Sequence, residues 1–78
     1  MQILTLIQTC SESPSQWEGK LEDGRQIYIR YRWGELTIDL IQDSKETNLL
    51  TEQLGSEYDG SLPEKKLRKI LSKHGFKF

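Results

Sequence analysis

Tyr28, Arg30 and Arg32 are spaced two residues apart. In a β-strand their side chains would therefore point to the same side, with successive members roughly 6.5–7 Å apart. A guanidinium group binds phosphate through two parallel hydrogen bonds, and a tyrosine ring offers a face on which a base can stack. Arg25 and Trp33 flank this row. We predict that these five residues bind an anionic ligand, either a nucleotide or the phosphates of a nucleic acid.

Acidic residues near the row allow a second interpretation. In the strand pairing predicted below, Glu35 faces Arg32, and Glu18 or Asp39 lies near Arg30. Cross-strand ion pairs would then cancel the positive charge, and the arginines would stabilise the sheet instead of binding a ligand. The sequence leaves both interpretations open.

Catalytic and metal-binding groups are few. Cys10 and His74 are the single cysteine and the single histidine, and their spacing indicates no third group that would orient a nucleophile–base pair. Four acidic residues could in principle bind a divalent cation or act as a pair, namely Asp39, Asp43, Glu46 and Asp59. They lack the spacing of a calcium-binding loop. We expect no enzyme, no metal and no cofactor.

The Tyr/Arg row lies on a segment that alternates strictly between apolar and polar side chains. Residues 26–33 and 35–41 both show this alternation, which predicts two strands joined by a two-residue turn at Trp33-Gly34. The turn would place each apolar residue opposite an apolar one. A slip of one residue would destroy the match, whereas a longer loop of the same parity would keep it.

The turn before this hairpin decides which residues of the preceding strand are buried. A two-residue turn at Asp23-Gly24 would place Lys20 opposite Ile27. A three-residue loop over 22–24, with Gly24 in the left-handed conformation, would instead place Trp17 on the core face. We choose the three-residue loop because burying a charged lysine costs free energy, whereas burying a tryptophan is favourable.

The first strand, residues 2–8, is apolar on both faces. Ile3 and Ile7 fall on one side, and Leu4 and Leu6 on the other. Such a strand is either central and covered twice or part of a subunit contact. We expect homo-oligomerisation through the edge of this strand. The alternative is that a short helix predicted after the strands buries the excess apolar surface.

Two helices are predicted after the strands. Ser44 is expected to cap a short helix through Leu49, Leu50 and Leu54 that Gly55 ends.

The second helix has stronger signals at both ends. Residues 61–64 match a capping box with an early proline, and Leu67 and Leu71 share one apolar stripe. Gly75 is expected at the C-terminal end, with Phe76 against Leu71 in a Schellman motif. The predicted fold class is α+β, a small antiparallel sheet of about four strands with one or two helices packed on one face.

The composition supports a single domain over residues 1–78. The chain has no alanine and no valine, so its core must be built from large side chains. The net charge of −1 conceals blocks: residues 25–34 carry three arginines and no acid, and residues 35–59 carry seven acids against Lys45. No apolar run is long enough to span a membrane, and we expect a cytoplasmic location.

A second functional reading uses apolar surface. The first strand, Trp33 and the aromatic tail at Phe76 and Phe78 could serve a protein–protein interaction inhibitor or adaptor. The basic residues of the last helix could follow phosphates, lie on an anionic membrane or form an ordinary solvated face; we expect no membrane contact.

Several short segments resemble small uncharacterised proteins of bacterial and phage genomes. They are Trp17-Glu-Gly-Lys, Asp23-Gly-Arg, Tyr28-Ile-Arg-Tyr-Arg-Trp-Gly-Glu-Leu36, and Tyr58-Asp-Gly-Ser61 ahead of a short helix. The resemblance covers about half of the chain and transfers no catalytic residue. It implies a small accessory or regulatory product, such as a phage-type protein that sequesters an anionic nucleotide signal.

Overall fold

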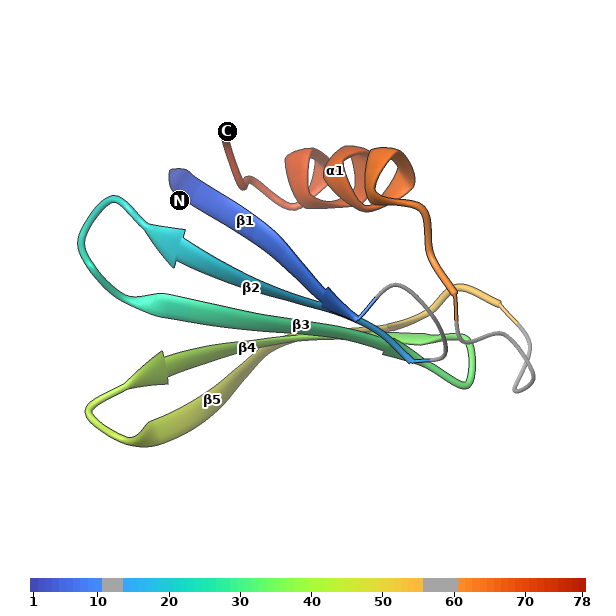
Figure 1. Ribbon diagram of the computed structural model, residues 1–78, viewed down its shortest axis with the longest axis horizontal. Helices are drawn as coiled ribbons and strands as arrows, with labels where there is room; N and C mark the ends of the chain where they lie inside the picture. Colours follow the sequence, from blue (N-terminus) through green and yellow to red (C-terminus); the bar gives the residue numbers. More distant parts are fainter. Residues whose placement is uncertain (11–13, 56–60) are drawn as a thin grey trace.

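The fold is an antiparallel sheet with a helix on one face. The computed structural model describes residues 1–10, 14–55 and 61–78, in which five strands and one helix are present (Figure 1). In chain order they are β1 (Ile3–Cys10), β2 (Ser15–Leu21), β3 (Gln26–Arg32), β4 (Glu35–Gln42), β5 (Lys45–Gln53) and α1 (Glu64–Lys73). Each strand pairs with the next one along the chain, so β1 and β5 are the two edges. The predicted fold class is confirmed in outline, with one strand more than expected.

The core lies between the inner face of the sheet and α1. Its buried apolar residues come from β1 to β4, from α1 and from the segments on either side of α1: Ile3, Trp17, Leu21, Ile27, Ile29, Tyr31, Leu36, Ile38, Leu40, Leu62, Leu67, Leu71 and Phe76. All of them are leucine, isoleucine or aromatic, as the absence of alanine and valine requires.

The hairpin of β3 and β4 has the predicted register. Arg32 pairs with Glu35 and Ile29 with Ile38, so apolar residues meet apolar ones along the whole ladder. Trp33 and Gly34 form the two-residue turn, with φ of 55° and 72°. Positive φ at both central residues is typical of a turn whose twist matches that of the strands.

The turn between β2 and β3 also follows the prediction. Gly24 has a φ of 89°, and Trp17 pairs with Ile29. Trp17 is fully buried, whereas Lys20 is exposed. The three-residue loop therefore buries the tryptophan, as expected from the relative cost of burying the two side chains.

The helix predicted from Ser44 to Leu54 is wrong, because this segment forms β5. Asp43 and Ser44 make a tight turn with φ of 51° and 65°, which returns the chain along β4. A shift in register leaves Leu49 as an extra residue, while Leu50 pairs with Ile38. The adjacent leucines therefore mark a bulge and not a helical stripe.

The first strand is an edge strand, so the alternative of a central strand covered twice is also wrong. Ile3 is buried, but Leu4 and Ile7 are 61% and 63% exposed. Beyond the start of β1, Gln2 forms a parallel bridge with Lys77 of the C-terminal tail. The two ends of the described chain consequently lie side by side (Figure 1).

The helix differs from the prediction at its start and agrees at its end. Pro63 occupies the N-cap and no side chain caps the helix, so the predicted capping box is wrong. The chain here is extended and held differently, since the Leu62 N–H donates to Ser15 Oγ at 3.1 Å. At the other end Gly75 has a φ of 89°, and the Phe76 N–H donates to the Leu71 carbonyl at 3.0 Å. This is the predicted Schellman motif.

Candidate functional site

The predicted Tyr/Arg row lies on the outer face of the sheet, opposite α1. The alternation of β3 turns Ile27, Ile29 and Tyr31 into the core, and so directs the intervening side chains outward. Arg30 and Arg32 are exposed, and Tyr28 is half-buried. The structure therefore brings Tyr28, Arg30 and Arg32 onto one surface.

Arg32 and Trp33 form a preassembled pair at the tip of the hairpin. The Arg32 guanidinium carbon lies 4.0 Å from the centre of the Trp33 ring, and Trp33 is 62% exposed. The turn is anchored from β5, since Gln53 Nε2 donates to the Trp33 carbonyl at 3.1 Å. A bulky residue with a φ of 55° is strained, and such strain often accompanies a functional role.

The ion pairs that could have neutralised the row are absent from the described residues. Three ion pairs form there, and none includes Arg30 or Arg32. Glu35 pairs with Arg32 in the strand register, yet the Arg32 side chain lies over Trp33. The two guanidinium groups therefore keep their hydrogen-bond donors available to a ligand.

Arg25 does not belong to this cluster. It lies at the opposite end of β3, where its Nε is 2.6 Å from Asp23 Oδ2. The backbone N–H of Arg25 also donates to Asp23 at 3.0 Å, and this bond is the main reason that the pKa of Asp23 is lowered. Arg25 thus stabilises its own turn, about 20 Å from Arg32 by strand rise.

The other end of the outer face is acidic. Asn48 Nδ2 donates to Asp39 Oδ1 at 2.9 Å. A hydrogen bond to Asp39, together with the negative charge of that group, raises the pKa of Glu46, and the charge of Arg30 opposes this to a lesser extent. We call Asp39, Glu46 and Asn48 the acidic cluster. The sequence named Asp39 and Glu46 as a possible pair, but it missed Asn48 because β5, which carries Asn48, was expected to be helical.

The remaining acidic candidates do not join that cluster. Asp43 lies in the turn between β4 and β5, and Asp59 is outside the described residues. Within the described part of the chain, no three His, Cys, Asp or Glu side chains gather so as to hold a metal ion.

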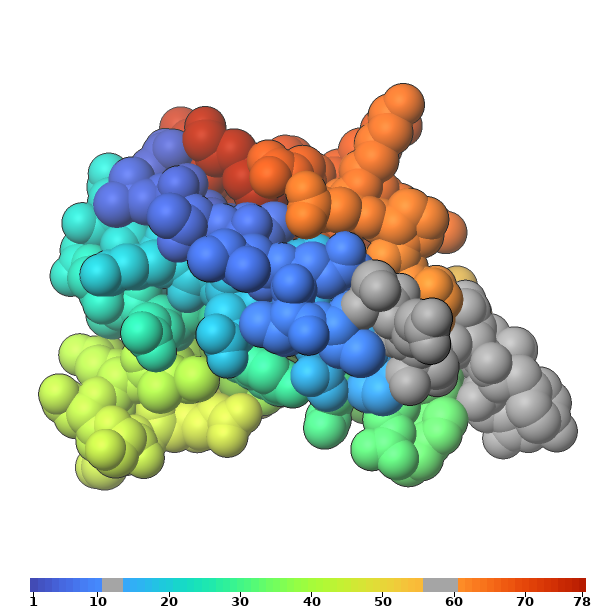
Figure 2. Space-filling model, viewed as in Figure 1, coloured from blue at the N-terminus to red at the C-terminus, as the bar shows by residue number. Residues whose placement is uncertain are grey.

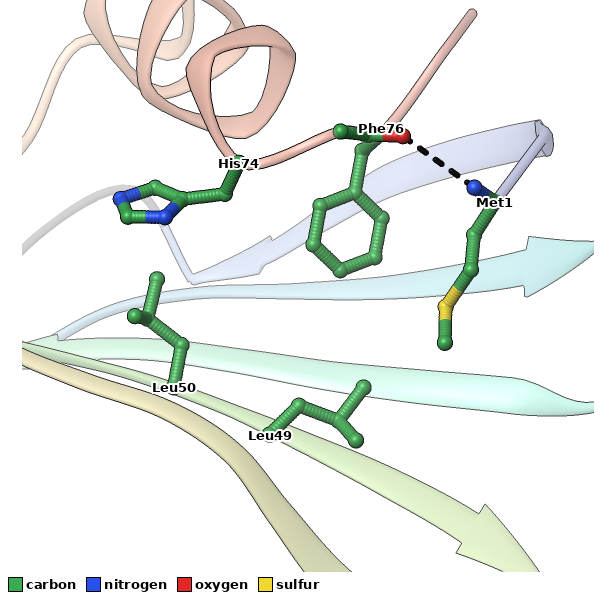
Figure 3. Close-up of a pocket in the computed structure, with 6 residues that line it drawn as sticks. Met1, Leu49, Leu50, His74 and Phe76 are labelled. Atoms are coloured by element: carbon green, nitrogen blue, oxygen red, sulfur yellow. Dashed lines mark hydrogen bonds between the residues drawn. The ribbon is translucent and has the colours of Figure 1, made fainter.

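A separate hollow of about 250 Å³ lies near the chain ends (Figure 3). Its lining includes Leu49, Leu50 and Phe76, and the Met1 ammonium donates to the Gly75 carbonyl at 3.1 Å beside it. Its sixth lining residue, His74, has Nε2 3.2 Å from Glu52 Oε2. The hollow is mainly apolar.

Cys10 and His74 are not brought together. His74 lines the hollow beside Met1, whereas Cys10 is at the far end of β1. Eight residues of strand span roughly 25 Å. The geometry therefore offers no contact between the two groups that nucleophile–base catalysis would require.

No protein-family model, no curated protein and no solved structure matches this chain. The resemblance to small bacterial and phage proteins accordingly stays a prediction. In the described residues, no helix has the length and apolar character needed to cross a membrane.

Proposed function

We propose that this protein is a non-catalytic binding module that holds a nucleotide, or a terminal nucleotide of a nucleic acid, on Arg30, Arg32 and Trp33. The observation that carries the proposal is the Arg32–Trp33 stack at the hairpin tip, 4.0 Å from guanidinium to ring centre. An exposed indole beside a guanidinium offers one surface for a base and another for a phosphate.

Arg30 supplies the second phosphate contact in this proposal. It lies two residues before Arg32 on the same face, and Thr37 stands opposite it on β4. Two guanidinium groups at this spacing suit two charged oxygens of one phosphate chain. Tyr28 borders the site as a half-buried ring, and Arg25 is excluded from it by its bond to Asp23.

The acidic cluster limits how far the ligand can extend. Beyond Arg30 an anionic chain would approach Asp39 and Glu46, and like charges there oppose binding. The proposal therefore favours a short ligand, such as a nucleotide signal that a cytoplasmic phage-type protein sequesters, over a long nucleic acid.

Calorimetric titration with ATP and with a short single-stranded oligonucleotide tests the proposal. We expect ATP to bind, with an affinity that falls as salt rises, and the double variant Arg30→Ala/Arg32→Ala to lose at least tenfold in affinity. Lys65→Ala/Lys66→Ala removes the same charge from exposed positions on α1 and should change little. Equal losses in both variants, or ATP binding that ignores the arginines, would contradict a specific site.

A protein-binding role is the alternative, favoured by the exposure of Ile7 and Trp33. The aromatic tail contributes less to it than the sequence suggested. Phe76 is buried in the core, and Phe78 lies under Arg68 with 4.6 Å from its ring centre to the guanidinium carbon. Association through apolar surface would be insensitive to salt, which separates it from phosphate binding.

A further inference from the structure

Among the described residues, the outer edge of β1 has no partner strand over most of its length. The C-terminal tail occupies only the start of this edge, where the Ile3 N–H donates to the Lys77 carbonyl at 2.7 Å. Past the bulge at Leu4, no strand of the described chain pairs with the outer side of residues 5–9. We call Thr5–Thr9 the free edge. In Figure 2 the start and middle of β1 (blue) lie at the surface of the face in view.

The opposite edge of the sheet is protected in ways that the free edge is not. β5 carries Lys45, Glu46 and Glu52 and has a bulge at Leu49, devices that discourage pairing with another strand. Residues 1–10 contain no charged side chain. Two copies of β1 could therefore approach each other without bringing like charges together.

The most exposed large apolar side chain of the described residues is at the centre of the free edge. Ile7 is 63% exposed and lies on the outer face, opposite Glu18 in the pairing with β2. An isoleucine exposed at the middle of an unpaired edge is apolar surface that a strand pairing there would remove from water.

We propose that two copies of this chain pair antiparallel through their free edges, about a two-fold axis at Ile7. The free edge matches itself in this arrangement, because Ile7 faces Ile7 of the second copy and Thr5 faces its Thr9. The axis is perpendicular to the sheet, so both α1 helices lie on the same side of one continuous sheet. A second copy is the occupant that an uncharged edge fits best, since nothing on it selects a charged partner.

The proposal does not depend on the anion site. Arg30 and Arg32 are on β3, separated from the free edge by β2. The bulges at Leu4 and Thr9 limit the paired segment to a few residues, so the contact is small. We therefore expect a concentration-dependent equilibrium between monomer and dimer.

Sedimentation velocity over a concentration series tests the proposal. The expected result is a mass that rises from one chain toward two for the wild type, and a monomer at every concentration for Ile7→Lys. Leu49→Lys places the same charge at an exposed leucine of the other edge strand and should still dimerise. A wild type that stays monomeric up to millimolar concentration, or equal behaviour of the two variants, overturns it.

Cross-linking provides a measurement that does not rely on weakening the fold. In a Cys10→Ser background, Ile7→Cys should give a disulfide-linked dimer with an added oxidant, because opposite residues of antiparallel strands have Cα atoms about 4.5–5.5 Å apart. Thr5→Cys should not, because the two Thr5 positions would be roughly 13 Å apart. Cross-linking of Thr5→Cys at the same rate as Ile7→Cys would exclude the proposed register.

Discussion

The inner face of the sheet forms the core, and the outer face carries the charged side chains of the proposed binding site. On the inner face, side chains such as Trp17, Ile29 and Leu36 are fully buried and exclude water. On the outer face, Arg30 and Arg32 lie toward one end of β3, and the acidic cluster lies toward the other end. Because side chains alternate along a strand, one hairpin supplies both faces. Stability and binding can therefore be changed separately, and the following variants test that separation.

The largest effect is expected on the inner side. Leu71 of α1 is fully buried, so Leu71→Ala should lower the free energy of unfolding by about 2–5 kcal/mol. Urea denaturation measures this. Ser72→Ala, at the next and exposed position of α1, should stay within about 0.5 kcal/mol of the wild type. If Arg30→Ala destabilised as strongly as Leu71→Ala, the two faces would not be separable.

Two neighbours on β2 repeat this contrast on a smaller scale. A Cβ added at Gly19 would lie 2.8 Å from Ile27 Cγ1 and 3.3 Å from the Thr5 carbonyl, so Gly19→Ala should cost about 1–3 kcal/mol through overpacking. Lys20→Ala, one residue along and on the outer face, should change little. The same denaturation experiment compares them, and equal costs would show that the inner face at Gly19 has room to relax.

Trp33→Asn should increase the stability of the fold and weaken ligand binding. Asparagine followed by glycine suits a turn with two positive φ values, and relief of strain should exceed the lost Arg32–Trp33 contact by about 1 kcal/mol. The variant should therefore melt higher and bind ATP more weakly. Calorimetry with and without ATP measures both effects. A lower melting temperature would mean that Trp33 supports the fold more than it strains it.

The smallest effects concern two exposed carboxyl groups with opposite pKa shifts. The pKa of Glu46 is raised in the folded protein by Asp39, so the folded state binds its proton more tightly than the unfolded state and loses stability as pH rises through this pKa. Glu46→Gln should therefore stabilise slightly at pH 7 and have no effect in acid.

Asp23 provides the control of opposite sign. Its pKa is lowered by Arg25, so its contribution is present above the ordinary pKa and is lost as pH falls. Asp23→Asn should destabilise slightly at pH 7, and this difference should also disappear in acid. Melting temperatures measured between pH 3 and pH 8 test both variants. If both variants shifted the melting temperature at pH 7 in the same direction, the opposite pKa shifts of Glu46 and Asp23 would be contradicted.

The sequence predicts the centre of the sheet better than its edges. Strict alternation and a two-residue turn determine the register of β3 and β4, because a slip of one residue would place apolar residues of one strand opposite polar residues of the other. In β5 the alternation is interrupted at Leu49, where a bulge adds one residue. The local sequence favours a helix there, but pairing with β4 makes the segment a strand. Such pairing between segments cannot be predicted from the sequence of one segment alone.

The candidate site could be predicted in part for the same reason. Placing Tyr28, Arg30 and Arg32 on one face needs only the period of a strand. Whether the Arg32 side chain contacts Glu35 or Trp33 depends on side-chain conformation at the turn. The proximity of Asp39 to Glu46 depends on β5. Both lie beyond what spacing alone can indicate.

The order of the elements has a consequence for synthesis on the ribosome. The strands occupy residues 3–53, and the residues that cover their inner face, from Leu62 to Phe76, follow them. A nascent chain therefore presents an assembled or assembling sheet whose apolar face is bare, beside an uncharged β1 edge, until α1 emerges. At roughly 5–20 residues per second this interval lasts a few seconds at most. A pause in translation that holds α1 inside the exit tunnel after the strands have left it should consequently favour aggregation, and a pause after α1 has emerged should not.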